Sequence, residues 1–278
     1  MPSTFNARDA EAYERVMGRW SRRLAGPFLD FACVDRGAVL DVGCGTGSLT
    51  FLLAERAPAI VSLSAIDVAP SYIAYAKANN RDPRVVFERA DAASLPFPDA
   101  SFDHCLSLLA LHLMSEPGRA MGEMVRVTRP GGTIAGAVWD VRGGLPHARM
   151  FLDTAAMFDP AAVAVRDRYM TVPLAQSGEL AALWRSHGLE DIEQTTVSVR
   201  FDFACFADYW EPFRTGEGTM GGYVATLDEA ATEQLGTHVR AAYESGAEDG
   251  PRSFVKAILA TTPRSPLTPI ASVILCGK

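Results

Sequence analysis

The chain of 278 residues is 48% hydrophobic and 21% charged, so it can bury a substantial core and is neither disordered nor fibrous. With 26 Lys and Arg against 33 Asp and Glu, its net charge is −7, and no basic run could follow a phosphate backbone, which disfavours a nucleic-acid partner. No apolar stretch approaches the ~20 residues that span a membrane, and the start of the chain has no apolar signal-peptide core.

Residues 1–36 have a helical pattern and precede the first strand, so we expect an N-terminal helical flap. From residue 38 onward, short apolar runs alternate with helical stretches. The predicted strands are 38–42, 60–66, 84–87, 102–109 and 133–139, and the predicted helices between them are 46–57, 71–80 and 118–127. Near-continuous apolar strands separated by helices predict an open, doubly wound, mostly parallel α/β sheet.

Further along the chain, a helix at 177–187 ends at Gly188, and residues 189–203 alternate as an extended strand. Residues 204–252 contain many aromatic residues, several glycines and one helix that opens with a capping box at 226–229. We expect a core at 37–203, an inserted helical cap at 204–252, and one or more last strands within 253–278 that complete the core. Either 253–261 or 270–276 can supply the last strand.

The five cysteines are odd in number, widely spread and never paired as C-x-x-C. This pattern predicts free thiols in a reducing compartment such as the cytoplasm, and it indicates neither a zinc site nor a disulfide framework.

The most informative stretch is residues 39–50, where a buried strand runs into Gly43, Gly45 and Gly47 and then into a helix. Glycines let the backbone turn sharply and approach a ligand, and open α/β sheets bind ligands at this position. The spacing is G-x-G-x-G, whereas dinucleotide sites use G-x-G-x-x-G. The motif therefore indicates a nucleoside-containing ligand other than a dinucleotide.

Carboxylates stand at successive strand ends: Asp41, Asp67 and Asp91. The second of these is placed to accept both hydroxyls of a ribose. Three acidic residues at one sheet edge would repel a pyrophosphate, but they suit a ligand that carries an amino group and a sulfonium.

These features resemble the class I S-adenosylmethionine-dependent methyltransferases, most of all the small-molecule branch that includes C-methyltransferases of ubiquinone and menaquinone biosynthesis. The resemblance covers roughly residues 36–140 and rests on the run Asp-Val-Gly-Cys-Gly-Thr-Gly at 41–47, Asp67, Asp91-Ala92, Phe102-Asp103 and Arg129-Pro130-Gly131-Gly132. Residues 13–20, which include Arg19, look like the flap that such enzymes fold over the cofactor. The amino-methyltransferase motifs Asn-Pro-Pro-Tyr and Asp-Pro-Pro-Tyr are absent from the fourth strand end.

The resemblance implies that S-adenosylmethionine is the cofactor and assigns its methionine end. Gly43 and Gly45 would let the backbone approach this portion, Asp41 would lie near its ammonium group, and Leu108 would line the same side. Backbone contacts would come from Cys44, and close helix packing from Gly47.

The resemblance also assigns the nucleoside end. Asp67 would hold the ribose hydroxyls, with Val68 against the adenine. Asp91 would accept from the adenine amino group, and Ala92 would donate its backbone N–H to the ring.

Candidates for the acceptor side are less specific. His112 follows the fourth strand and could take a proton from a phenol, enol or acid, although a packing role is the plainer interpretation. Trp139 could stack on a substrate or pack in the core, and Trp210 could belong to a substrate wall or bury the cap. His147 is a weaker alternative to His112.

We therefore predict an enzyme that transfers the methyl group of S-adenosylmethionine to a small-molecule acceptor by in-line displacement, without a metal. Two alternatives stay open: a non-catalytic protein that binds S-adenosylmethionine and, less favoured by the glycine spacing, a nicotinamide-dependent oxidoreductase. The sequence does not indicate the acceptor or the oligomeric state, because acceptor choice depends on the cap.

Overall fold

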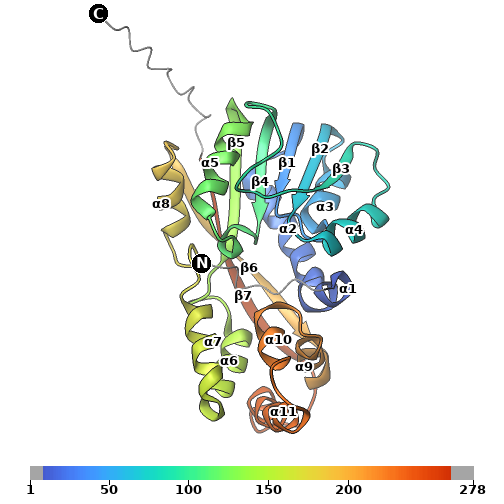
Figure 1. Ribbon diagram of the computed structural model, residues 1–278, viewed down its shortest axis with the longest axis vertical. Coiled ribbons are helices and arrows are strands. Elements are labelled where there is room, and N and C mark those ends of the chain that lie inside the picture. Colours follow the sequence, from blue (N-terminus) through green and yellow to red (C-terminus); the bar gives the residue numbers. More distant parts are fainter. Residues whose placement is uncertain (1–8, 264–278) are drawn as a thin grey trace, which may run out of the picture.

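A seven-stranded sheet forms the upper part of the molecule in Figure 1, a computed structural model that describes residues 9–263. Its strands are β1 (Arg36–Val42), β2 (Ala59–Asp67), β3 (Val85–Arg89), β4 (Phe102–Leu108), β5 (Thr128–Trp139), β6 (Ile192–Phe203) and β7 (Arg252–Pro263). Their order is β3-β2-β1-β4-β5-β7-β6, and β1 to β5 are parallel, whereas β7 is antiparallel to both neighbours. The sheet is thus the predicted open, mostly parallel one.

Helices cover both faces of this sheet because neighbouring strand residues point to opposite sides and are both apolar. On β1, Val39 packs in the cluster that contains α2 (Arg19–Ala32), α3 (Ser48–Arg56) and α4 (Pro70–Asn79). Its neighbour Leu40 packs in a second cluster with α5 (Pro117–Val127) and α8 (Glu179–Ser186). Continuous burial on two faces is what the unbroken apolar strands predict. None of the helices in residues 9–263 is long and apolar enough to cross a membrane.

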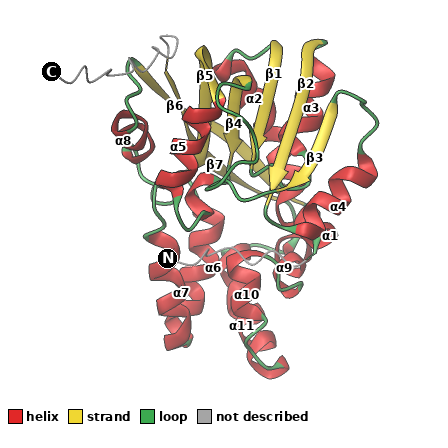
Figure 2. Cartoon of the chain, turned by 45° about the horizontal axis from the view of Figure 1, so that its top comes forward, coloured by secondary structure: helices red, strands yellow, loops and turns green. Residues whose placement is uncertain are grey.

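The cap lies at one end of the sheet and consists of two insertions (Figures 1 and 2). Between β5 and α8 lie α6 (Pro146–Phe158) and α7 (Pro160–Met170), and between β6 and β7 lie α9 (Phe206–Arg214), α10 (Gly218–Val224) and α11 (Glu229–Glu244). The insertions pack together: the rings of Phe158 and His238 stack at 3.7 Å, and the Tyr223 hydroxyl donates to Asp159 at 2.7 Å. The sequence predicted only the second insertion as cap.

Strands β6 and β7 form a long antiparallel ribbon that joins the sheet to the cap. They pair continuously from Ile192 with Pro263 to Phe203 with Arg252, whereas β5 pairs with β7 only over residues 136–139. The last strand described therefore corresponds to the first predicted alternative, and the other, 270–276, lies outside the described residues.

The helix in the cap begins after Asp228, whose side chain accepts from the Ala231 N–H, and it buries Leu235 on its inner face.

The N-terminal segment contains α1 (Ala10–Tyr13), a π-helical turn η1 (Glu14–Gly18) and then α2. Helix α2 is part of the core, because the Trp20 ring is 2% exposed and stacks on Phe201 at 4.1 Å. Of the expected flap, residues 9–18 are therefore the part that precedes this core helix.

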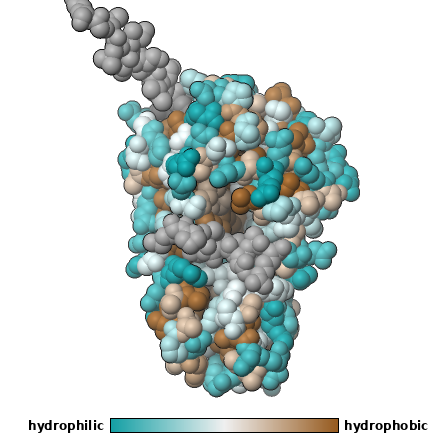
Figure 3. Space-filling model, in the orientation of Figure 1, coloured by the Kyte–Doolittle hydropathy of each residue, from teal (hydrophilic) through white to brown (hydrophobic). Residues whose placement is uncertain are grey.

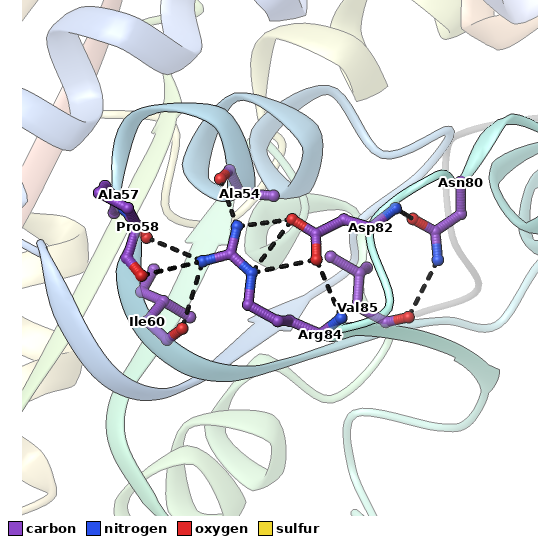
Figure 4. A network of polar contacts seen from close by, with 8 residues as sticks. All are labelled: Ala54, Ala57, Pro58, Ile60, Asn80, Asp82, Arg84 and Val85. Atoms are coloured by element: carbon purple, nitrogen blue, oxygen red, sulfur yellow. Dashed lines mark hydrogen bonds and ion pairs between the residues drawn. The ribbon is translucent and has the colours of Figure 1, made fainter.

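At the edge of the sheet away from the cap, Arg84 links the connection between α3 and β2 to the connection between α4 and β3 (Figure 4). Its guanidinium donates to the carbonyls of Ala54 at 2.7 Å and of Ala57, Pro58 and Ile60 at 3.3 Å each, and it also pairs with Asp82. The hydrogen bond from Arg84 lowers the pKa of the Asp82 carboxyl. This network sets where β2 and β3 begin.

Of the cysteines, Cys33, Cys44, Cys105 and Cys205 are free thiols, and Cys276 lies outside the described residues.

Candidate active site

A cavity of about 420 Å³ opens between the carboxyl ends of the parallel strands and the cap. Its wall combines the glycine turn after β1, the ends of β2 to β5, the N-terminal segment, and residues of both cap insertions and of β7. In Figure 3 the surface is hollowed between the upper and lower parts of the molecule, and hydrophobic residues gather at the rim. The cavity is where an open α/β sheet places its ligand.

The glycine turn forms one wall of this cavity. Gly43, Gly45 and Gly47 have φ angles of +76°, +56° and +94°, which side chains rarely adopt. The N–H groups of Gly43 and Cys44 both donate to the Ile66 carbonyl, at 2.8 and 2.9 Å, and so bind the turn to β2. A Cβ on Gly43 would collide with the Cβ of Ala110, whereas a Cβ on Gly45 would enter the cavity, 3.5 Å from the Tyr13 hydroxyl. The backbone at Gly45 is thus open to a ligand.

Asp67, at the end of β2, lies in the wall and also holds the glycine turn. Its Oδ2 accepts from the Gly45 N–H and its Oδ1 from the Ala69 N–H, each at 2.9 Å. Burial raises the pKa of this carboxyl, and the two backbone hydrogen bonds oppose that shift. One carboxylate therefore shapes the turn on which the cavity depends.

The end of the cavity beyond Asp67 contains the residues assigned to the adenine. Val68, Asp91 and Ala92 all line it. The side chain of Val68 is 63% exposed, which is unusual for valine and leaves an apolar surface beside the cavity. Asp91 accepts from the Ala93 N–H at 2.9 Å, which fixes the turn after β3.

Four other residues assigned to the cofactor do not line the cavity. They are Asp41, Cys44, Gly47 and Leu108. A Cβ on Gly47 would meet the Phe51 ring at 2.7 Å, so this glycine serves helix packing. Leu109 and Ala110 form the wall after β4 in place of Leu108.

Asp41 lies behind the glycine turn and is 1% exposed. Its Oδ2 accepts from the Thr50 hydroxyl at 2.6 Å, and its Oδ1 has no partner among the described residues. Burial raises the pKa of this carboxyl to about 7. An unpartnered carboxylate oxygen beneath the turn fits a positively charged group above it.

The N-terminal segment covers the cavity and is fastened to the sheet and to the cap. Tyr13 and Arg19 line the wall. The Tyr13 ring packs against Tyr72 of α4 at 4.8 Å, and Arg19 pairs with Asp208 of α9 at 2.9 Å. Glu14 accepts from the Thr46 hydroxyl at 2.6 Å, which links the π-helical turn to the glycine turn.

Glu217, at the start of α10, completes this fastening. It is fully buried and accepts from the Tyr72 hydroxyl and, at 3.1 Å, from the Asp9 N–H. The glycine-rich segment that follows is the helix α10, and the sequence did not predict it as a helix. One carboxylate thereby joins the cap, α4 and the N-terminal segment over the cavity.

We expect Tyr72→Phe to loosen this cover without unfolding the core. The variant removes the hydroxyl that donates to the buried Glu217 carboxylate, and losing a hydrogen bond to a buried charged group is costly. Amide hydrogen exchange should become faster in residues 9–18 and 217–224 and stay unchanged in β1 and β4. Tyr75→Phe, on the same helix, is the control. Unchanged exchange in both segments would contradict a closing role for the Tyr72–Glu217 contact.

The other end of the cavity is largely aromatic. Its wall includes Trp139, Tyr169, Phe201, Phe203, Tyr209 and Phe213, together with His147 and Lys256. The Tyr209 hydroxyl donates to the His147 carbonyl at 2.8 Å. This end suits a flat, apolar molecule.

The structure brings His112 into the wall, on the short 3₁₀ helix η2 (Leu111–Leu113). The imidazole is 5% exposed, and its Nδ1 has no partner among the described residues. Burial lowers the pKa of His112 to about 3, so the ring is neutral and only weakly basic at neutral pH. Such a ring is better suited to hydrogen bonding than to taking a proton.

Of the two tryptophans assigned to the substrate side, Trp139 lines the cavity and Trp210 does not. The Trp210 ring stacks with Phe151 and Phe206 inside the cap, each at 6.0 Å between centroids. Lys256 is a site residue that the sequence analysis missed. It could have been found in the sequence because a lysine alternates with Phe254 and Ile258 on the inward-facing side of an apolar strand.

Comparison with known proteins gives this geometry its family. Residues 40–136 match a family model described as a methyltransferase domain. The chain is 38% identical over 138 residues to the 27-O-demethylrifamycin SV methyltransferase of Amycolatopsis mediterranei, a match that covers 46% of each chain. It is 39% identical over 118 residues to the demethylmenaquinone methyltransferase of Thermus thermophilus, covering 42% of this chain and 52% of that one.

Among solved structures, phosphoethanolamine N-methyltransferase 2 of Haemonchus contortus in complex with S-adenosyl-L-methionine has the same fold. The TM-score is 0.57 at 17% identity, over 92% of this chain and 56% of that one. The chain spans about half the length of the curated relatives it matches. The glycine turn, the acidic strand ends and these matches together identify residues 40–136 as a methyltransferase domain.

Proposed function

We propose that this chain transfers a methyl group from S-adenosylmethionine to a small, largely apolar acceptor. One observation carries the proposal: a single cavity joins the glycine turn and the acidic strand ends to an aromatic chamber under the cap. The names of two relatives, a demethylrifamycin and a demethylmenaquinone methyltransferase, support a small-molecule acceptor.

The residues present fit the cofactor. Gly45 leaves open backbone where a Cβ would fill the cavity, and the unpartnered Oδ1 of Asp41 lies beneath the same turn. Gly43, Gly45 and Asp41 would hold the methionine portion, directly or through water. Asp67 would hold the ribose, and Val68, Asp91 and Ala92 the adenine. When bound, the sulfonium supplies an electrophilic methyl group.

The chain's own contribution is alignment and the exclusion of water. The cover formed by residues 9–18 and α10 closes the cavity, and Trp139, Phe201 and Phe203 give the acceptor a rigid apolar wall. Holding two reactants in line contributes up to ~7–11 kcal/mol to lowering a barrier. We assign His112 a hydrogen-bonding role toward the acceptor, because its ring is neutral.

Calorimetric titration with S-adenosylhomocysteine is the first test, and we expect saturable binding. No binding at millimolar ligand would reject the proposal, and tight binding of NADH instead would favour an oxidoreductase. The second test incubates the chain with S-adenosylmethionine and a panel of phenols, enols, acids and amines, and measures S-adenosylhomocysteine release. Binding without release from any acceptor would favour a non-catalytic role.

A further inference from the structure

Lys256 is a buried basic residue at the aromatic end of the cavity. It is 2% exposed, and its Nζ lies 4.0 Å from the ring centroid of Phe201 and 4.4 Å from that of Trp139. The residue lines the cavity, as do both of these aromatic residues. The lysine tip therefore faces ring surfaces and a ligand space, not solvent.

No counter-charge accompanies this amine. Within residues 9–263, the Lys256 amine has no hydrogen bond and no ion pair. The carboxylates in the cavity wall are engaged elsewhere: Asp67 with the glycine turn, Asp91 with Ala93, and Glu217 with Tyr72 and Asp9.

The elements packed around Lys256 place no acid against its amine in the part of the chain that the structure describes. Trp139 comes from β5, Phe201 from β6 and His147 from α6, and the Tyr209 hydroxyl of α9 donates to the His147 carbonyl. Arg19, another cation of the cavity wall, already pairs with Asp208. Asp202 of β6 pairs with Arg23 and accepts from Ser253.

A permanently charged ammonium in such a place would be costly, because burial removes its hydration and nothing replaces it. Burial instead holds the pKa of Lys256 well below its usual range. This burial favours the neutral amine, whose lone pair can accept a proton. Once protonated, it would lie over two aromatic faces, which stabilise a cation.

We propose that Lys256 binds an acidic oxygen of the acceptor, a phenol or enol hydroxyl or a carboxyl group on an otherwise apolar molecule. The inference rests on the proposed function and names its substrate class. For a hydroxyl, the O–H bond breaks, a new N–H bond forms at Nζ, and the oxygen keeps the electron pair. A neutral acid and a neutral amine thus enter without burying net charge and become an ion pair inside the cavity. The oxyanion is the more nucleophilic form of such an acceptor.

The probes are 4-nitrophenol, whose ionised form is yellow, 4-nitrobenzoic acid, and 4-nitrotoluene as the matched neutral compound. Each is titrated into the wild-type chain, with and without saturating S-adenosylhomocysteine, at a pH where free 4-nitrophenol is mostly un-ionised. Bound 4-nitrophenol should show the phenolate spectrum and bind at least ~10-fold more tightly than 4-nitrotoluene. 4-Nitrobenzoic acid enters already ionised, so its binding should take up one proton, seen as a buffer-dependent enthalpy.

Lys256→Met keeps length and apolar volume but removes the amine, and exposed Lys77→Met is the matched control. Lys256→Met should abolish the phenolate spectrum, the proton uptake and the preference over 4-nitrotoluene, while S-adenosylhomocysteine affinity stays within twofold of wild type. The tighter of the two acidic probes identifies the phenol or the carboxyl class. Equal affinity for all three probes in the wild type, or a preference that survives in Lys256→Met, would overturn the inference.

The two proposals fail separately. Absence of S-adenosylhomocysteine binding rejects the proposed function, while the probe titrations without it still report on Lys256. If Lys256→Met did not fold, the bound spectrum in the wild type would decide alone, since an un-ionised bound phenol contradicts proton transfer to the amine.

Discussion

Replacing Gly43 with alanine should abolish cofactor binding, raising the dissociation constant for S-adenosylhomocysteine by at least ~100-fold. The residue has a φ of +76°, and the added Cβ would collide with the Cβ of Ala110 in the wall of the cavity. Relief requires either the glycine turn or the segment after β4 to move, and both border the methionine end. Calorimetry with S-adenosylhomocysteine measures the effect.

Gly131→Ala separates this collision from backbone strain alone. Its φ is +84°, and an added Cβ would have nothing within 4 Å. The control should therefore cost ~1–2 kcal/mol of stability through strain and leave cofactor affinity unchanged. If both variants lose affinity equally, strain and not the collision accounts for the loss.

Asp67→Ala should weaken S-adenosylhomocysteine binding by one to two orders of magnitude and should also lower the melting temperature. The change removes the acceptor of two backbone hydrogen bonds, from Gly45 and Ala69, in addition to the proposed ribose contacts. Hydrogen bonds to a charged group contribute ~1.5–3 kcal/mol each. Binding and thermal unfolding are measured on the same preparation.

Two comparisons sharpen the interpretation of Asp67. Asp67→Asn keeps the size and one acceptor oxygen, so it should fall between wild type and Asp67→Ala in both measurements. A nucleoside without the ribose 2′-hydroxyl should lose affinity for the wild type but not for Asp67→Ala. Full affinity in Asp67→Ala would show that this carboxylate holds neither the turn nor the ribose.

Local patterns were sufficient to predict the core of the fold. The strand that contains Val39 and Leu40 is apolar on both faces. The glycines that follow it have the positive φ angles that a tight turn requires. The helix that buries Leu235 was predicted from a capping box at 226–229, and the structure begins it at Glu229 with Asp228 as the cap. In each case a few neighbouring residues determine the outcome.

The residues that were missed or placed differently depend on contacts distant in the chain. Lys256 becomes a cavity residue only because β7 inserts beside β5. Glu217 becomes part of the cover through Tyr72 and Asp9, which are 145 and 208 residues away. Trp210 packs inside the cap because Phe151, from the other insertion, lies against it. The helices α6 and α7 were not predicted as cap because nothing in the sequence between β5 and α8 indicates that α6 packs against α11 and α7 against α10.

The long ribbon of β6 and β7 also sets the order in which the two halves of the cavity are made during synthesis. The strands that carry the cofactor end, β1 to β4, are complete by residue 108, and they can pair as soon as they leave the ribosome. The aromatic end can form only after β7 has inserted between β5 and β6. Because β7 follows the helices α9 to α11 in the chain, it is synthesised after them. Until β7 has inserted, the edge of β5 that it covers has no partner strand, and Lys256 is missing from the cavity wall. We therefore expect a nascent chain to form the proposed nucleoside-binding half before the proposed acceptor half, and a truncation before Arg252 to lack the acceptor half.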